Sequence, residues 1–455
     1  MSSHESFLSE LRALLSEGAV SSAAEDLNFY SVDQGPVVDL QLPLAVIWPT
    51  EVSDVQAVLR LAGKHGVSVV SRGAGTGVSG GAHATRNSVI LSLERMNRIL
   101  EIHPEDEIAV VQPGVINAEL NEAVKPYGLM YAPDPASYRL STLGGNIATN
   151  AGGLRCAKYG VTRDSVLALD VVLADGSLIH TGHRTFKGVA GYDLTGLFVG
   201  SEGTLGIVVG ATLRLKYLPV SSRTLAIFFE DFRTAAAGVL AVGKARVQPA
   251  IMELLDGASM QDIDNRMHSR LRSRGGALLL IQTDGFAAQA EAEAVAAAVA
   301  PLGGTLYQED PEEAHRLLEL RRNSRGMDAD LETRVGEDVA VPRSRLVDYI
   351  AATELLAARH SVNVRVVAHA GDGNLHPTFW IQDEDREGIN RLNAALDESV
   401  ELALAMGGTI TGEHGIGQFK LRWLGQEQSL EVRQLQSRLK LLFDPEQLLN
   451  PGKAI

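Results

Sequence analysis

One segment says most about how this chain folds: Pro133-Asp-Pro-Ala-Ser-Tyr-Arg-Leu-Ser-Thr-Leu-Gly-Gly-Asn-Ile-Ala-Thr-Asn-Ala-Gly-Gly153. Its hydroxyl and amide side chains supply many hydrogen-bonding groups. Its two glycine pairs let the backbone approach a ligand closely. This composition favours a loop that encloses a polar ligand, and a purely structural turn is the alternative.

A second glycine-rich loop, Ser71-Arg-Gly-Ala-Gly-Thr-Gly-Val-Ser-Gly-Gly81, follows an expected buried strand at residues 67–70. It is close to the dinucleotide fingerprint G-x-G-x-x-G, but Val78 occupies the third glycine position, and the loop leads into a strand where a Rossmann loop opens a helix. Successive small residues can still direct backbone N–H groups at phosphate oxygens. Arg72 and Thr76 would add a charge and a hydroxyl. A tight turn between strands is the alternative.

A third loop of the same style is Gly200-Ser-Glu-Gly-Thr-Leu-Gly-Ile207. Three such loops exceed what a simple phosphate needs. They suit a large ligand that combines a diphosphate, a sugar and a flat ring. A set of unrelated turns is the alternative explanation.

Composition limits the class of protein. With 455 residues the chain is long enough for two or three domains. A net charge of −15 argues against a general nucleic-acid-binding protein, which needs a basic surface. The single cysteine, Cys156, excludes an internal disulfide and an iron–sulfur cluster. We see no run of membrane-spanning length and no secretory signal at the N-terminus, so a cytoplasmic location is the default expectation.

The pattern of elements changes near Pro219. Before it, strands and helices alternate with glycine loops, and residues 52–66 have helical spacing. After it, the alternation predicts an α+β domain whose sheet is covered on one side. The expected strands there are 223–229, 251–255 and 277–282, and the expected helices are 232–245, 287–300, 314–325, 345–359 and 387–406. Residues 443–452 are expected to form a loop-like tail.

The densest group of reactive side chains lies near the end of the chain. It comprises His369-Ala-Gly-Asp-Gly-Asn-Leu-His376 and Thr411-Gly-Glu413-His414-Gly. Apolar residues on both sides of the first segment predict a hairpin in which His369 faces His376, with Cβ atoms about 4.5–5.5 Å apart. Glu413 could then add a third ligand to a divalent ion and leave one position open for substrate. Ordinary hydrogen-bonded core histidines are the alternative.

Taken together, these motifs resemble one known family. The three loops, the segment Gly191-Tyr-Asp-Leu194 and the two histidine segments resemble the vanillyl-alcohol-oxidase type of flavoproteins. The similarity is to the branch of the glycolate oxidase flavin subunit, D-lactate dehydrogenases and D-2-hydroxyglutarate dehydrogenase, and it covers roughly residues 44–455. It implies an α+β architecture with a two-subdomain FAD-binding domain at 1–219, an α+β substrate (cap) domain carrying the metal histidines at 220–407, and a C-terminal segment at 408–455 that packs on the FAD domain.

The resemblance also implies which residues bind FAD. We expect non-covalent FAD, because the first loop has no histidine before Gly81 and Cys156 is not placed to form a thioether. Ser71 replaces the family's usual proline. The expected FAD-binding residues are Arg72, Gly73, Ala74, Gly75, Thr76, Gly77, Pro133, Asp134, Ser141, Thr142, Gly144, Gly145, Asn146, Thr149, Asn150, Gly152, Gly153, Glu202, Gly203, Ile207 and Asn450.

The same resemblance supports roles for the remaining site residues. Its metal ligands match His369, His376 and Glu413, with zinc or manganese as the expected ion. We expect His414 to point away from the ion and to act as general base, since imidazole exchanges protons near neutral pH. The family's carboxylate-binding arginine matches Arg321, whose neighbour Arg322 is the competing candidate. A solvated helix face is the structural alternative for both.

The predicted function is oxidation of a small D-2-hydroxy acid, of the D-lactate or glycolate type, to the 2-oxo acid with hydride transfer to flavin N5. Electrons would leave to an external acceptor: a quinone, an electron-transfer flavoprotein, a partner subunit or oxygen. Gly336 stands where the hydroxyglutarate branch has a lysine, and Thr378 stands where the family has an asparagine. Both departures argue against a dicarboxylate substrate. The alternatives are a flavin subunit that is inactive alone, a D-2-hydroxyglutarate dehydrogenase and a flavin-free metal-dependent hydrolase. A homodimer is left open.

Overall fold

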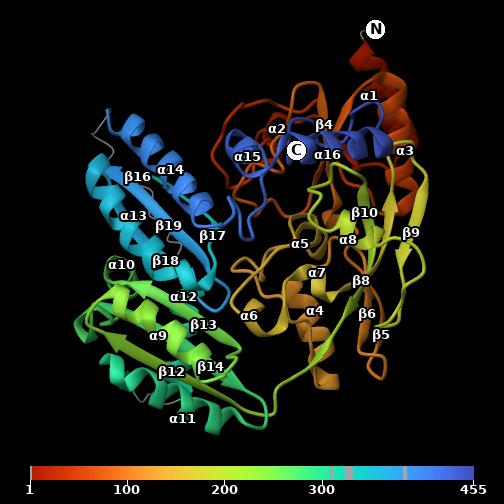
Figure 1. Ribbon diagram of the computed structural model, residues 1–455. Helices are drawn as coiled ribbons and strands as arrows, with labels where there is room; N and C mark the ends of the chain where they lie inside the picture. Colours follow the sequence, from red (N-terminus) through yellow and green to blue (C-terminus); the bar gives the residue numbers. More distant parts are fainter. Residues whose placement is uncertain (1–2, 308–310, 323–331, 383–386) are drawn as a thin grey trace. The chain divides into compact units, whose positions relative to one another are not determined.

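The computed structural model describes residues 3–307, 311–322, 332–382 and 387–455 (Figure 1). The chain divides into two compact units, each with its own sheets. The first unit contains Met1–Gly152, Gly160–Leu218 and Glu413–Ile455, and the second contains Gly153–Tyr159 and Pro219–Gly412. In the described part of the chain, no helix is both long and apolar enough to cross a membrane.

The first sheet of the first unit has four strands in the order β1-β2-β4-β3, and β2 and β3 run parallel to β4. Helix α3 begins where the Asp54 carboxylate accepts the backbone N–H of Glu51, and it ends at Gly66 in the left-handed conformation. It was predicted from its spacing and is confirmed. The bounds are β1 Val20–Ser21, β2 Val46–Ile47, β3 Ser68–Arg72, β4 Ser88–Ser92, α1 Ser3–Leu14, α2 Ala24–Tyr30 and α3 Val52–His65.

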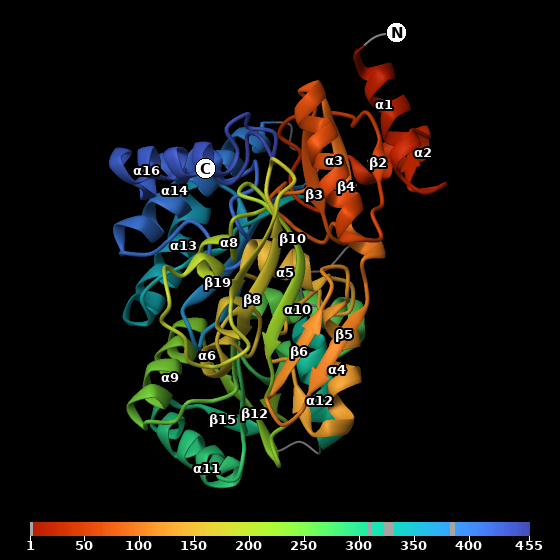
Figure 2. The same ribbon diagram turned by 90° about the vertical axis from the view of Figure 1, so that its right-hand side faces the viewer.

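The second sheet of this unit has five antiparallel strands in the order β5-β6-β10-β8-β9, and its apolar face packs against α4, α5 and α8 (Figure 2). Helix α5 lies inside the Pro133–Gly153 segment, which was expected to be loop throughout. The bounds are β5 Ile99–His103, β6 Ile108–Val111, β8 Val166–Val172, β9 Leu178–Gly182, β10 Ile207–Arg214, α4 Asn117–Val124, α5 Leu143–Thr149, α7 Thr162–Ser165 and α8 Leu194–Phe198. A two-stranded sheet joins β7 Leu129–Met130 to β11 Lys216–Tyr217.

The C-terminal segment returns to the first unit, as the resemblance implied. Helices α15 (Leu421–Glu427) and α16 (Leu430–Phe443) were not foreseen. Beyond them, Leu449 forms a parallel bridge with Val69 of β3. The buried Lys440 ammonium group donates to the carbonyl oxygens of Thr204 and Leu449, at 2.7 and 2.8 Å. These bonds attach the expected loop-like tail to the third glycine loop.

The second unit is built on one eight-stranded antiparallel sheet in the order β15-β12-β14-β13-β18-β19-β16, with β17 paired to β19. Each strand predicted after Pro219 is present, as are the predicted helices in their described parts; residues 323–325 of the 314–325 prediction lie outside the described residues. The strands are β12 Ser222–Phe229, β13 Ile251–Asp256, β14 Ala277–Asp284, β15 Thr305–Tyr307, β16 Glu332–Gly336, β17 Val339–Ala340, β18 Asn363–His369 and β19 Asn374–Gln382. The helices are α9 Phe232–Lys244, α10 Gly257–Met267, α11 Ala288–Val299, α12 Pro311–Arg322, α13 Leu346–His360 and α14 Gly388–Ala405.

Both faces of this sheet are covered, so the prediction of a single covered face is wrong. Helices α9, α11, α13 and α14 form one layer, where Gly238 of α9 lies against Phe229 and Leu279. Helices α10 and α12 pack on the opposite face, where Met260 and Leu317 share a cluster with alternate strand residues such as Phe228. The sequence pattern concealed this because fully buried strands are apolar on both sides.

A short piece from within the expected FAD-binding region belongs to the second unit. Residues Gly153–Tyr159 include the one-turn helix α6, Cys156–Tyr159. The Tyr159 hydroxyl donates to the Asp284 carboxylate at 2.6 Å, and Lys158 forms an ion pair with the same carboxylate. Cys156 is half-buried.

Candidate functional site

The first glycine loop has the form of an anion cradle. In the described part of the chain, no acceptor takes a hydrogen bond from the backbone N–H groups of residues 73–77. A Cβ atom at Gly73 would lie 2.2 Å from the Thr142 Oγ1 atom, so only glycine allows this approach. Converging backbone N–H groups of small residues are suited to phosphate oxygens. The loop therefore fits the diphosphate of a large cofactor.

Arg72 supports this loop from behind. Its side chain is buried, its Nη1 atom donates to the Val32 carbonyl at 2.8 Å, and its guanidinium lies over the Tyr30 ring. Burial lowers the pKa of the Arg72 side chain. It also lies beside Gly75, whose φ of +71° requires glycine. The structure therefore shows Arg72 shaping the loop, and a direct phosphate contact is a separate expectation.

The second segment meets the first through the start of α5. The Thr142 hydroxyl accepts the Gly145 N–H at 3.2 Å, which caps the helix. Gly144 lies so close to Pro113 that a Cβ atom would meet the Pro113 Cβ at 2.6 Å. Asn150 ends the helix in the left-handed conformation, and its side chain accepts the Arg163 N–H. Helix capping and close approach thus explain much of the Gly, Asn and Thr content of this segment.

The third loop and the tail are joined by Asn450. Its side-chain oxygen accepts the Ser71 N–H at 3.0 Å, and its amide donates to the Glu202 carbonyl at 2.5 Å. The buried Glu202 carboxylate accepts the N–H groups of Ile416 and Gly417, at 2.7 and 2.8 Å, and burial raises its pKa. Glu202 and Asn450 therefore hold segments of the first unit together.

The remaining residues expected at the FAD site are distributed along the same segments. Pro133 accepts a hydrogen bond from Asn117 through its carbonyl, Asp134, Ser141 and Asn146 are buried, and Ile207 begins β10. The Thr149 hydroxyl donates to the Gly145 carbonyl. Gly203 adopts φ +70° beside Ser71. Gly152 ends one stretch of the first unit, and Gly153 belongs to the second unit. Ala74, Thr76 and Gly77 lie half-buried in the first loop.

A buried group of charges in the first unit was missed by the sequence analysis. Lys453 is 1% exposed, and its ammonium group donates to the His83 carbonyl. The His83 Nε2 atom lies 3.0 Å from the Asp33 carboxylate, and both side chains are buried. Burial lowers the pKa of Lys453 to about 7, against the opposing effect of the Asp33 and Glu202 charges. Lys453 directly follows Asn450-Pro451-Gly452 of the expected loop-like tail, and nothing in that sequence indicates a buried lysine.

The two histidines of the second unit lie together, although their register differs from the prediction. Asn374 is the direct partner of His369, and His376 pairs with Val367. The histidines are therefore diagonal neighbours on one face of the sheet. Their ring centroids are 5.1 Å apart with the planes nearly perpendicular, and both rings are buried. The turn covers residues 370–373, so the strands extend further than the sequence indicated.

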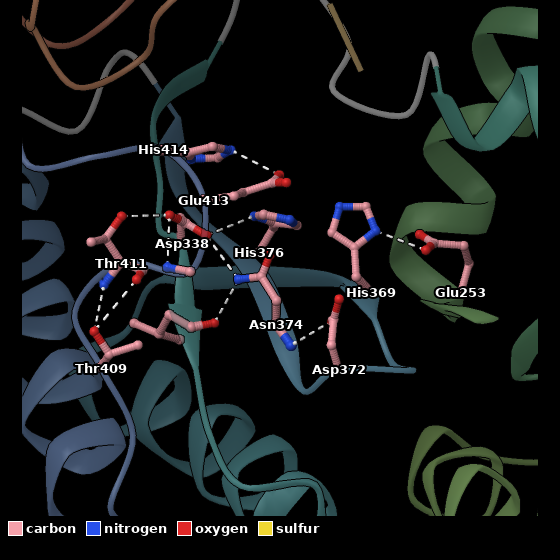
Figure 3. Close-up of polar contacts among 12 residues, drawn as sticks. Glu253, Asp338, His369, Asp372, Asn374, His376, Thr409, Thr411, Glu413 and His414 are labelled. Atoms are coloured by element: carbon pink, nitrogen blue, oxygen red, sulfur yellow. Dashed lines mark hydrogen bonds and ion pairs between the residues drawn. The ribbon is translucent and has the colours of Figure 1, made fainter. Parts of the chain in front are cut away.

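Asp338 fixes the chain that leads to Glu413. Its buried carboxylate accepts hydrogen bonds from the Thr411 hydroxyl at 2.8 Å, the Gly412 N–H at 3.0 Å and the Asn374 side-chain amide at 2.8 Å (Figure 3). Its Oδ1 atom lies 3.8 Å from the His376 Nδ1 atom. The sequence analysis gave Asp338 no role. It connects the hairpin to the segment that precedes Glu413.

Glu413 follows Gly412 directly, and one carboxylate oxygen of Glu413 and one nitrogen each of His369 and His376 lie within 4.8 Å of one another. Two imidazoles and a carboxylate are a typical donor set for zinc or manganese. Asp338, His376 and His414 form an overlapping group with the same spacing. The His414 Nε2 atom lies 3.3 Å from the Glu413 carboxylate. His414 was predicted to point away, but its ring lies beside this candidate ligand.

Glu253 is the second residue that the sequence analysis missed. Its Oε1 atom lies 2.7 Å from the His369 Nδ1 atom, and its Oε2 atom lies 2.6 Å from the Arg321 Nη2 atom. Arg321 is 3% exposed, which excludes the solvated helix face considered for it. Arg322 instead lies near Glu319 of its own helix. The available signal was the Glu253 carboxylate in the middle of the otherwise apolar run Ile251–Leu255.

Comparison with known proteins finds two family models that match this chain. Residues 43–182 match the family model described as "FAD binding domain", and residues 218–454 match "FAD linked oxidases, C-terminal domain". The glycolate oxidase subunit GlcD of Bacillus subtilis is 41% identical over 93% of this chain and 91% of its own length. A D-lactate dehydrogenase of Archaeoglobus fulgidus is 35% identical over 90% of this chain and 91% of its own.

Solved structures show the same fold. P-cresol methylhydroxylase aligns with a TM-score of 0.82 at 19% identity, over 99% of this chain and 96% of that one. The fold is thus that of an FAD-binding oxidoreductase of the vanillyl-alcohol-oxidase type, as the resemblance implied. Within this class, the chain belongs to the family of FAD-linked oxidases. The flavin-free hydrolase alternative is therefore set aside.

Proposed function

We propose that this chain oxidises a small D-2-hydroxy acid, of the D-lactate or glycolate type, to the corresponding 2-oxo acid with FAD and a divalent metal. Relatives named as glycolate oxidase subunits and D-lactate dehydrogenases support the substrate class. The observation that carries the metal role is the buried pair His369 and His376, together with a Glu413 carboxylate oxygen within 4.8 Å of a nitrogen of each.

The residues of the two candidate sites fit both FAD and a divalent metal ion. Bound FAD supplies a two-electron acceptor that takes up the hydrogen removed from the substrate carbon. A divalent ion held by His369, His376 and Glu413 supplies a Lewis acid that favours ionisation of the substrate hydroxyl. The open backbone N–H groups of residues 73–77 would hold the diphosphate of FAD.

His414 and Arg321 act on the substrate directly in this proposal. His414 takes the hydroxyl proton, since imidazole is a base near neutral pH; its contact with Glu413 keeps its ring beside the candidate ligands. Arg321 binds the substrate carboxylate, because a guanidinium group matches that group's geometry. Glu253 holds Arg321 close to His369. Zinc and manganese are both compatible with this donor set.

The sheet beside the histidines favours a small substrate. Gly336 of β16 pairs with Thr378 of β19, and Thr378 lies on the same face as His376 two residues earlier. The hydroxyglutarate branch that the chain resembles has a lysine at the first of these positions, and the family has an asparagine at the second. Neither residue here supplies a cation for a second carboxylate. We therefore place D-2-hydroxyglutarate below D-lactate and glycolate as a substrate.

A second candidate concerns the electron acceptor. Several relatives are named as subunits, which favours a form of this chain that passes electrons to a partner subunit. A quinone, an electron-transfer flavoprotein and oxygen are the other acceptors we consider. A cytoplasmic location and a homodimer stay expectations of the sequence.

The test is anaerobic bleaching of the flavin absorbance by a panel of acids. We expect D-lactate or glycolate to bleach the purified, metal-loaded protein, and L-lactate and D-2-hydroxyglutarate to do so far more slowly. This assay requires no assumption about the acceptor. Bleaching by none of the 2-hydroxy acids would contradict the proposed function, and bleaching without turnover of an artificial dye would favour the partner-dependent form.

A further inference from the structure

Glu253 is an unusual residue in its strand. Strand β13 runs through the centre of the eight-stranded sheet, and its other central side chains are buried and apolar. Glu253 is 0% exposed. Carboxylates are almost never fully buried unless they are paired, because removing the charge from water is costly. A specific role for this side chain is therefore expected.

The two oxygens of this carboxylate have different partners. Oε1 lies 2.7 Å from the His369 Nδ1 atom, and Oε2 lies 2.6 Å from the Arg321 Nη2 atom. These partners come from β18 and α12, which are separate elements of the second unit. Glu253 thus connects a candidate metal ligand to the candidate carboxylate-binding arginine.

We propose that Glu253 is a positioning residue that orients both His369 and Arg321. When the Nδ1–H of His369 donates to Glu253, the Nε2 lone pair is the one left for an ion, and the ring cannot turn away. The ion pair on the other oxygen holds the guanidinium beside the same histidine. One buried carboxylate therefore sets the geometry of metal binding and of substrate binding. This inference rests on the metal role proposed above.

The experiment compares Glu253→Gln with a matched control on the same strand. The control is Asp256→Asn, which changes the half-buried carboxylate at the end of β13, whose partners are the N–H groups of Ser259 and Val366. Chelator-treated, flavin-loaded protein is titrated with Mn²⁺. We expect E253Q to bind Mn²⁺ roughly 10- to 100-fold more weakly, the effect typical of lost hydrogen-bond partners of metal ligands. D256N should bind Mn²⁺ like the unaltered protein, and both should retain FAD.

Kinetics provide a readout that a purely structural role would not change. At saturating Mn²⁺, E253Q should show a raised KM for D-lactate with a smaller change in kcat, because Arg321 has lost its ionic partner. If E253Q does not fold, Glu253→Asp keeps the charge but shortens the side chain, and it should also weaken Mn²⁺ binding.

Three results would overturn the inference, and they are distinguishable. If His376→Ala abolishes Mn²⁺ binding while E253Q binds as the unaltered protein does, the metal site stands and the role of Glu253 is wrong. If H376A also binds Mn²⁺ normally, the proposed metal site is wrong and the role of Glu253 falls with it. If E253Q and D256N weaken Mn²⁺ binding equally, Glu253 has only a structural role.

Discussion

The two units of this chain build their candidate sites from different parts of the amino acid. In the first unit the backbone predominates: Gly73 permits a close approach, and residues 73–77 present N–H groups. In the second unit the side chains predominate, because Glu253, His369 and His376 project from one face of a sheet. The difference shows how each candidate site is damaged by substitution. A site made of backbone groups is damaged when a new side chain clashes with it, whereas a site made of side chains is damaged when a charge or a metal ligand is removed.

Buried charges follow the same division. In the first unit, Lys453 and Glu202 donate to or accept from backbone groups and so attach one segment to another. In the second unit, Glu253 and Asp338 contact the side chains to which we assign chemistry. Substitution of the first pair should alter stability, and substitution of the second pair should alter reactivity.

The largest effect on turnover is expected at the candidate metal site of His369, His376 and Glu413. Replacing His376 with Ala should lower turnover of D-lactate at least about 100-fold, because metal catalysis supplies several kcal/mol and each 1.36 kcal/mol is about tenfold in rate. FAD content should not change, since His376 lies outside the glycine loops. His360→Ala is the control, because His360 pairs with Glu398 in the same unit, at the end of α13. Near-normal turnover of H376A would refute the metal role.

A substitution in the first glycine loop should affect FAD binding and leave metal binding unchanged, the reverse of H376A. Gly73→Ala would place a Cβ atom 2.2 Å from the Thr142 Oγ1 atom. Strain of about 1–3 kcal/mol corresponds to roughly 10- to 100-fold weaker FAD binding, whereas the Mn²⁺ affinity should stay unchanged. The control is Gly63→Ala in α3, where a Cβ atom would meet Leu448 at an ordinary 3.6 Å. If G73A retains full FAD affinity, the loop is not the cofactor cradle.

The smallest effect concerns stability alone. Burial lowers the pKa of Lys453 to about 7 in the folded chain, while an unfolded lysine titrates near about 10.4. Between these values the unfolded state binds more protons, so the Lys453 contribution makes stability rise with pH, by at most about 1.4 kcal/mol per pH unit. Below pH 7 both states are protonated and this contribution is constant.

Replacing Lys453 with Met should therefore flatten the rise of Tm between pH 7 and 9. The exposed Lys125 provides the control, since K125M should keep the slope of the unaltered chain. A K453M slope equal to that of the unaltered chain would show that Lys453 does not titrate in this range.

Several elements were predictable because their signals are local. The helical spacing of residues 52–66 predicted α3, and the glycine loops and the histidine hairpin were visible as motifs. Helix α16 was missed because much of its apolar surface, including Leu430 and Leu435, is exposed and forms no clear buried stripe. The hairpin register was missed by two residues, since the turn and not the strand composition sets it.

Residue types and short spacings indicated a large diphosphate-containing ligand and a histidine-rich second site, and the resemblance to a known family identified the ligand as FAD. The partners of Glu253 could not be found in this way, because His369 lies 116 positions along the chain and meets it across the sheet. Asp338 likewise reaches the segment before Glu413 only after β17 pairs with β19. The type of chemistry that a segment can perform is determined by neighbouring residues in the sequence. The orientation of a reactive side chain depends on buried groups that come together only when the sheet forms.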